Sequence, residues 1–125
     1  MLNKKKILIV DDSETALMLA TMVLKKFHLE IVTAKDGEEG IEKAKTDKPD
    51  LILLDLVMPK KNGMETLKEI RNMEGIKAIP IIMVTTHGEA EKVEKSYTYG
   101  CNDYIIKPFK SGELISKIES LVEIE

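Results

Sequence analysis

Acidic residues stand directly behind two apolar segments of the sequence. Ile7-Leu8-Ile9-Val10 is followed by Asp11 and Asp12, and Leu51-Ile52-Leu53-Leu54 is followed by Asp55. If the two segments lie side by side, their carboxylates repel one another by about 4 kcal/mol per pair at 4 Å and an effective dielectric constant near 20. A hard divalent cation would relieve this repulsion, and carboxylate, carbonyl and water ligands suit Mg²⁺. We therefore predict that the three aspartates bind Mg²⁺.

Two further polar residues follow apolar segments. Thr85 comes after Ile81-Ile82-Met83-Val84, and Lys107 comes after Tyr104-Ile105-Ile106. A hydroxyl and an ammonium beside a carboxylate and a cation suit a phosphoryl group, because phosphoryl transfer depends mainly on positioning and on neutralising oxygen charge. Asp55 could then act as a nucleophile and form an acyl phosphate. A lone aspartate after a strand more often only caps a turn, so this prediction depends on its neighbours.

The apolar segments are expected to form one parallel sheet. Four aliphatic residues in succession, as in 51–54, are typical of a strand that is buried on both faces between helices. The sequence predicts strands at 6–10, 30–34, 51–54, 81–84 and 103–106 and helices at about 14–27, 36–46, 62–70, 88–99 and from 111 onward. This alternation predicts an α/β fold, a doubly wound sheet of five parallel strands with five helices. The carboxyl ends of parallel strands meet at one edge of such a sheet, where ligands bind.

Three of the predicted helices begin with a polar residue that is followed three positions later by a glutamate, the spacing of a capping box. The pairs are Asp36 with Glu39, Asn62 with Glu65 and Thr86 with Glu89. The fourth helix has a thin apolar face, made of Ala90, Val93 and Tyr97. Because so little of it would be buried, we expect it to be mobile.

The composition is that of an ordinary globular domain without a general attraction to nucleic acid. The chain has 125 residues, of which 43% are apolar and 33% charged, and a formal net charge of -3. We expect one domain over residues 1–125 and no direct nucleic-acid binding. No apolar run approaches the roughly 20 residues that span a bilayer, and no signal peptide is recognisable, so we expect a cytoplasmic protein without membrane contact. The single cysteine, Cys101, is expected to be a small buried residue.

Several short motifs stand together at the predicted strand ends. They are Asp11-Asp12, Asp55 with Pro59 and Gly63 behind it, Thr85, and Tyr104 with Lys107-Pro108-Phe109. In their joint spacing they resemble the receiver domain of two-component response regulators, and the chain is similar to stand-alone receivers of the chemotaxis type from residue 5 to about residue 123. The resemblance implies a flavodoxin-like sheet with strand order 2-1-3-4-5. It also implies a cis peptide bond between Lys107 and Pro108.

The resemblance assigns roles to the predicted acidic site. Asp55 would accept a phosphoryl group from the phosphohistidine of a histidine kinase or phosphotransfer protein. Asp12 and Asp55 would bind Mg²⁺ directly, with the backbone carbonyl of Val57 as a third ligand. Asp11 would act mainly through metal-bound water.

The resemblance also implies a conformational switch. Thr85 would bond one phosphoryl oxygen, and Lys107 would pair with another. Tyr104 would turn inward as Thr85 is drawn to the phosphate. This movement would remodel the surface made by the fourth helix, the last strand and the last helix, and so control a downstream protein target.

Two residues beside the predicted site are expected to set the phosphate lifetime. Val57 lies two positions after Asp55, and His87 lies two positions after Thr85. Both positions would tune the access of water to an acyl phosphate. The sequence does not give the direction of the effect.

The function expected from these residues is that of a phosphorylation-driven switch and not of an enzyme that turns over a substrate, although the chain would promote its own phosphorylation and dephosphorylation. One alternative is a small Mg²⁺-dependent phosphatase or phosphotransferase that works through an aspartyl-phosphate. Such enzymes typically carry a second acid two residues after the nucleophile, where this chain has Val57. Another alternative is a docking module that works unphosphorylated. The sequence ends soon after the last predicted helix, so we expect a complete chain without an output domain.

Overall fold

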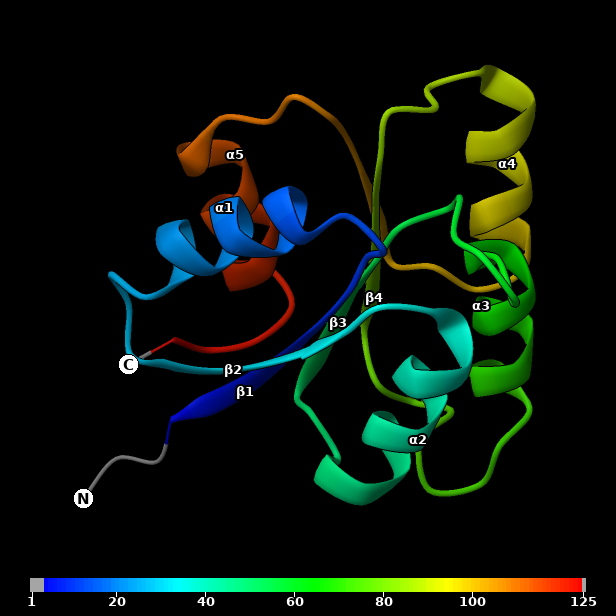
Figure 1. The fold of residues 1–125 in the computed structure, drawn as a ribbon, viewed down its shortest axis with the longest axis horizontal. Helices are drawn as coiled ribbons and strands as arrows, with labels where there is room; N and C mark the ends of the chain where they lie inside the picture. Colours follow the sequence, from blue (N-terminus) through cyan, green and yellow to red (C-terminus); the bar gives the residue numbers. More distant parts are fainter. Residues whose placement is uncertain (1–3, 125) are drawn as a thin grey trace.

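Five parallel strands form a single sheet in the order β2-β1-β3-β4-β5, with helices on both faces (Figure 1). The computed structural model describes residues 4–124, so residues 1–3 and 125 of the predicted domain lie outside the described part. The strands are β1 (Lys5–Val10), β2 (Leu29–Ala34), β3 (Leu51–Leu54), β4 (Ile81–Thr85) and β5 (Asp103–Ile106). The helices are α1 (Glu14–Leu24), α2 (Gly37–Asp47), α3 (Gly63–Arg71), α4 (Ala90–Thr98) and α5 (Ser111–Glu119). The predicted fold class and strand order are confirmed.

The core lies in two layers, one on each face of the sheet. Alternate residues of a strand point to opposite faces, so β3 sends Leu51 and Leu53 toward α1 and α5, and Ile52 and Leu54 toward α2 and α3. Figure 1 shows α1 and α5 on one side of the sheet and α2, α3 and α4 on the other. All four β3 residues are buried. The uninterrupted apolar run therefore follows from helices that cover both faces.

The sheet register brings the residues that follow the strands to one edge. Val10 pairs with Ala34 on one side and with Leu54 on the other, so β1, β2 and β3 end level with one another. The backbone ladder continues one step further, because the amide of Asp11 donates to the carbonyl of Ala34 at 3.0 Å and the amide of Asp55 donates to the carbonyl of Val10 at 2.9 Å. The backbone of both aspartates is thus fixed by the sheet itself.

The helix starts agree only in part with the predicted capping boxes. At α3 the box is complete, with Asn62 and Glu65 each accepting from the other's backbone amide. At α2, Asp36 caps the amide of Glu39, but the Glu39 carboxylate accepts from the amide of Lys35, one residue earlier than a capping box requires. The predicted cap by Asp36 is therefore present, but the predicted return bond from Glu39 to the amide of Asp36 was wrong.

The helix α4 begins at Ala90, and the predicted start near Gly88 with a capping box from Thr86 was wrong. Residues 86–89 are held as a loop by β5, because the carbonyl of His87 accepts a hydrogen bond from the Tyr104 hydroxyl at 2.6 Å. A side chain at Gly88 would also meet Ile106.

The burial of α4 is thin, as predicted, but it involves other residues. Ser96 is its one fully buried residue, and Val93 is half-buried. Tyr97, which was expected to hold the helix down, has 46% of its surface exposed. A similar correction applies to α1, which ends at Leu24 and leaves Phe27 outside the helix and 37% exposed.

Cys101 is buried and unpaired, as the sequence predicted. Burial, and next the neighbouring Asp103, raises the pKa of its thiol to about 11. The predicted cis bond between Lys107 and Pro108 is also present. Within residues 4–124, none of the helices combines the length and the apolar character that a membrane span requires.

Gly63 allows α3 to begin directly against the backbone that follows β3. Its amide donates to the carbonyl of Leu56 at 2.7 Å. A β-carbon at this position would collide with the carbonyl of Asp55 and would lie 2.8 Å from the Leu56 α-carbon. Since these are backbone atoms, they cannot move aside without displacing Asp55.

We expect Gly63→Ala to lower the free energy of unfolding by about 1–3 kcal/mol, the usual effect of overpacking. Gly112→Ala is the matched control, because it lies in α5 and, apart from its chain neighbours and the backbone of its own helix, no atom lies within 4 Å of the added carbon. The control should be neutral or gain up to about 1 kcal/mol from helix propensity. Urea unfolding followed by circular dichroism measures both changes. Equal stabilities for the two variants would show that the close approach at Gly63 is not a constraint.

Candidate functional site

Three carboxylates converge where β1 and β3 end. Asp11, Asp12 and Asp55 each place an oxygen within 4.8 Å of the other two. Asp11 is 4% exposed and Asp12 is exposed. Asp55 has a side chain that is 12% exposed. The cluster therefore has a buried side against the sheet and an open side toward solvent.

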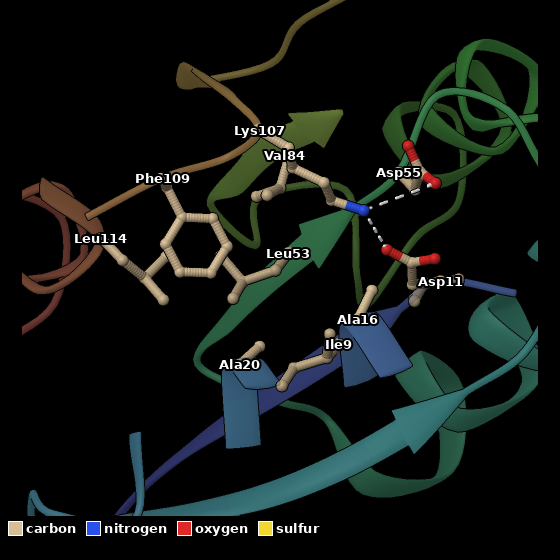
Figure 2. Close-up of a pocket in the computed structure, with 11 residues that line it drawn as sticks. Ile9, Asp11, Ala16, Ala20, Leu53, Asp55, Val84, Lys107, Phe109 and Leu114 are labelled. Carbon is tan, nitrogen blue, oxygen red and sulfur yellow. Dashed lines mark hydrogen bonds and ion pairs between the residues drawn. The ribbon is translucent and has the colours of Figure 1, made fainter. Parts of the chain in front are cut away.

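Lys107 brings one positive charge to this cluster. Its Nζ lies 2.5 Å from Oδ2 of Asp11 and 3.8 Å from Oδ2 of Asp55 (Figure 2). The residue follows β5, and its amide donates to the carbonyl of Thr85 at 2.8 Å, which anchors it beside the end of β4. Figure 2 shows its ammonium between the two carboxylates. One ammonium against three carboxylates leaves the cluster negative.

A small cavity lies beneath the ammonium. It has a volume of about 20 Å³ and is lined mainly by apolar side chains of β1, β3, α1 and the segment after β5, among them Ile9, Leu53 and Phe109 (Figure 2). A cavity of this size can hold about one water molecule. The apolar lining lowers the local dielectric constant and so strengthens the interactions among the charged groups above it.

The carboxyl of Asp55 is held in an environment that resists its ionisation. Burial, and next the charge of Asp11, raises its pKa, whereas Lys107 and the Thr85 hydroxyl act in the opposite direction. Its Oδ1 accepts from the amide of Leu56 at 2.8 Å, and its Oδ2 faces Lys107. One oxygen is therefore oriented by the backbone, and the other faces the site.

Ser13 is a site residue that the sequence reasoning missed. Its amide donates to Oδ1 of Asp11 at 3.0 Å, while its hydroxyl caps α1 by accepting from the amide of Ala16 at 3.2 Å. The orientation of Asp11 is thus coupled to the start of α1. A serine between an acidic pair and an amphipathic segment is the sequence pattern that predicts such a cap.

The other predicted residues surround the cluster at different depths. Thr85 is 1% exposed and lies beneath it. Tyr104 is 8% exposed, with its hydroxyl bonded to the carbonyl of His87, so its side chain already has the inward position that the resemblance assigns to the switched form. Val57 is 53% exposed at the rim. The His87 ring does not point into the cluster, since its Nδ1 lies 3.3 Å from both Glu89 and Lys92.

The donor set fits a hard divalent cation. The three carboxylates offer oxygen ligands only, and a single ammonium does not balance their charge. Among the hydrogen bonds of residues 4–124, none ends on the carbonyl oxygen of Val57, so this atom is available as a further ligand. Asp12 gives the exposed access that a partly hydrated ion such as Mg²⁺ needs.

The chain is similar to known proteins in both sequence and structure. The family model described as response regulator receiver domain matches residues 7–119. The chain is 37% identical over 118 residues to the alkaline phosphatase synthesis transcriptional regulatory protein PhoP of Bacillus subtilis, covering 94% of this chain and 48% of that protein. The chain thus spans about half the length of the first curated relatives that it matches.

Two solved structures share the fold closely. The chemotaxis protein CheY4 of Vibrio cholerae superimposes with a TM-score of 0.90 at 31% identity, covering 95% of this chain and 99% of that one. The receiver domain of the sensor histidine kinase PA1611 from Pseudomonas aeruginosa has a TM-score of 0.88 at 28% identity, covering 94% and 97% of the two chains. That structure has a magnesium ion coordinated in its active site cleft.

Replacing Asp55 with asparagine is expected to raise the free energy of unfolding in the absence of divalent cations. Since the pKa of Asp55 is raised on folding, the folded chain binds this proton more tightly than the unfolded chain. The native protein therefore loses stability as the pH rises from 3.8, the ordinary pKa of an aspartate carboxyl, through the higher pKa that Asp55 has in the folded chain. Because asparagine does not ionise, the variant does not lose stability over this pH range through residue 55.

We expect the variant to gain on the order of 1 kcal/mol near pH 7, because asparagine removes a buried charge and its repulsion from Asp11. The gain should stay below the roughly 4 kcal/mol of a like-charge pair at 4 Å, since Lys107 already offsets part of the repulsion. The gain should shrink as the pH falls toward 3.8. Urea titrations over this pH range measure it, with Asp47→Asn in α2 as the control. A variant less stable than the native chain at pH 7 would contradict the assigned environment.

Proposed function

The chain belongs to the response regulator receiver domain family, and from this premise we propose that Asp55 accepts a phosphoryl group in a reaction that requires Mg²⁺. The observation that carries the proposal is the arrangement of the Asp55 carboxylate. One of its oxygens is fixed by the amide of Leu56, and the other lies 3.8 Å from the ammonium of Lys107. A nucleophilic oxygen is thereby aimed at a point where a transferred phosphoryl group meets a positive charge.

The proposed reaction transfers the group from a phosphohistidine. An oxygen of Asp55 forms the new bond to phosphorus while the bond from phosphorus to the imidazole nitrogen breaks, and the imidazole leaves with that electron pair. Lys107 pairs with one phosphoryl oxygen, and the hydroxyl of Thr85 donates to another. Mg²⁺, held by Asp12, Asp55 and the Val57 carbonyl beside Asp11, would neutralise charge on the carboxylates and the phosphoryl oxygens.

Lys107 has to change partner during this reaction. Its Nζ is closer to Asp11, at 2.5 Å, than to Asp55, at 3.8 Å. A phosphoryl group on Asp55 would add negative charge on the Asp55 side and draw the ammonium there. The ion pair with Asp11 thus holds Lys107 ready without blocking the acceptor oxygen.

The same groups connect the site to a surface that could signal. Thr85 leads into the loop of residues 86–89, whose His87 carbonyl is bonded to Tyr104 of β5. A shift of Thr85 toward a phosphoryl oxygen would therefore pull on the loop, on Tyr104 and on the start of α4. Because α4 buries only Ser96 completely, its position can change at little cost. We propose that the α4, β5 and α5 surface contacts a downstream protein.

The phosphoryl donor is proposed to be a histidine kinase or a phosphotransfer protein that covers α1. Met18, Leu19 and Met22 are 57%, 53% and 59% exposed on this helix. Beside them, a groove of about 420 Å³ runs between α1 and the segment after β5, with Leu19 and Lys107 among its lining residues. Since Lys107 also lines the acid site, a protein that brings a phosphohistidine to Asp55 would bury these apolar side chains.

Incubation with Mg²⁺ and acetyl phosphate, followed by intact mass measurement, tests the function. We expect a gain of one phosphoryl group that requires Mg²⁺ and is absent in Asp55→Asn but retained in Asp47→Asn, the control variant in α2. Labelling that persists in Asp55→Asn would assign the acceptor elsewhere. Continuous release of phosphate from varied organic esters would instead indicate an enzyme that turns over substrates.

Val57 and His87 are expected to set the lifetime of the phosphorylated form. Val57 presents an apolar surface at the rim, so Val57→Asn, which can bind and orient water, should speed the loss of phosphate roughly tenfold, equal to about 1.4 kcal/mol. His87→Ala should have a smaller effect, because the ring faces Glu89 and Lys92. Loss of mass with time after removal of acetyl phosphate measures both rates. Unchanged rates in both variants would remove these residues from the mechanism.

A further inference from the structure

A second groove lies between the loop after β3 and helix α4, next to the acid cluster, with which it shares Val57. It has a volume of about 440 Å³ and is lined by Val57, Met58, Asn62, Met64, Lys92 and Lys95. We call it the α3–α4 groove, because Met64 belongs to α3 and both lysines belong to α4. The two helices lie side by side (Figure 1), and the Ser96 hydroxyl contacts the sulfur of Met64 at 4.0 Å. The proposed phosphorylation chemistry does not use Met58, Asn62, Met64, Lys92 or Lys95.

The polar groups of the α3–α4 groove are hydrogen-bond donors. The Nζ of Lys92 lies 3.3 Å from Nδ1 of His87, and none of the described carboxylates comes within 4 Å of it. Lys95 pairs with Glu91 at 3.4 Å, but both side chains are exposed, and such pairs contribute little stability. Asn62 uses its side-chain oxygen to cap α3, which leaves its amide hydrogens to donate. The groove thus offers positive charge and donors without an acidic group in its lining.

The remaining wall of the groove is apolar and adaptable. Met58 is 7% exposed, Met64 is half-buried and Val57 is 53% exposed. Methionine side chains are unbranched and polarizable, so they can adjust to apolar groups of different shapes. A large aliphatic side chain could therefore be accommodated between Met58 and Met64.

A groove on the neighbouring surface differs from the α3–α4 groove in the charges of its lining. Between α2 and α3, Glu38, Glu42 and Glu69 line a groove together with Lys45 and Lys61. There both partners of an ion pair belong to the lining, as in the contact of Lys61 with Glu69. That groove carries charges of both signs, whereas the charged residues that line the α3–α4 groove are both lysines.

We propose that the α3–α4 groove binds an acidic segment of another protein. A large aliphatic side chain of the segment packs against Met58 and Met64, and carboxylates on either side of it pair with Lys92 and Lys95. Charge complementarity selects this occupant, because the lining holds two ammonium groups and one amide but no carboxylate. The interaction goes beyond the proposed phosphorylation and does not require it, although Val57 places the occupant beside Asp55.

Nuclear magnetic resonance titration of the full chain with two synthetic peptides tests this proposal. The peptides are 12 residues long and identical except that a central leucine is flanked, one helical turn away on each side, by glutamates in one and by lysines in the other. We expect saturable amide shifts concentrated at residues 56–64 and 92–95 with the glutamate peptide only. Replacement of its leucine by alanine should weaken binding at least about fivefold, as expected from the lost apolar contact.

Charge reversal supplies the decisive comparison. The double variant Lys92→Glu/Lys95→Glu should lose at least about tenfold in affinity for the glutamate peptide and gain binding of the lysine peptide. Lys45→Glu/Lys77→Glu, which changes the same charge on other surfaces, is the matched control and should bind as the native chain does. If the reversed variant fails to fold, Lys92→Gln/Lys95→Gln replaces it, with the same loss expected for the glutamate peptide.

Three results would overturn the proposal. The first is an absence of saturable shifts with the glutamate peptide. The second is a set of shifts that maps to another surface, such as α1 or α5. The third is equal affinity of the glutamate peptide for the native chain and for the double variant, which would show that the two lysines do not select the partner.

Discussion

Crowding of negative charge at one edge of the sheet is the constraint on which the site depends. Asp11 and Asp55 follow adjacent strands, and the sheet ladder fixes the backbone of both, so their carboxylates cannot move far apart. Lys107 compensates part of this charge, mostly at Asp11. Burial, and next the charge of Asp11, raises the pKa of Asp55, and the remaining negative charge of the cluster favours a bound cation. The arrangement that opposes folding stability is thus the one on which the proposed chemistry depends.

The parts of this arrangement that depend on the sheet could be predicted from the sequence. Continuous apolar runs gave the strands, and residues that follow parallel strands must gather at one edge, as Asp11, Asp55 and Lys107 do. The capping box at Asn62 was predictable for a similar reason, because both of its partners are local in sequence. The order of the strands came from the resemblance of the motifs, since periodicity alone does not specify which strands are neighbours.

Features that depend on tertiary contacts could not be predicted in this way. Thr86 has the sequence of a helix cap, yet the bond from Tyr104 to the His87 carbonyl holds the loop and delays α4 to Ala90. Lys107 lies closer to Asp11 than to Asp55, and the sequence pattern does not predict this difference in distance. The α3–α4 groove combines Met58 and Met64 with lysines that lie about thirty residues further along the chain, so its lining emerges only when the two helices pack.

The all-oxygen character of the acid cluster has a consequence for metal identity. The aspartates provide no nitrogen or sulfur ligand, and Asp12 leaves the cluster open to solvent. Such a donor set discriminates weakly among hard divalent ions, because selection by ligand softness or by a rigid cage is absent from it. The relative abundance of these ions in the surrounding medium, more than the chain itself, would then determine which of them occupies the proposed site.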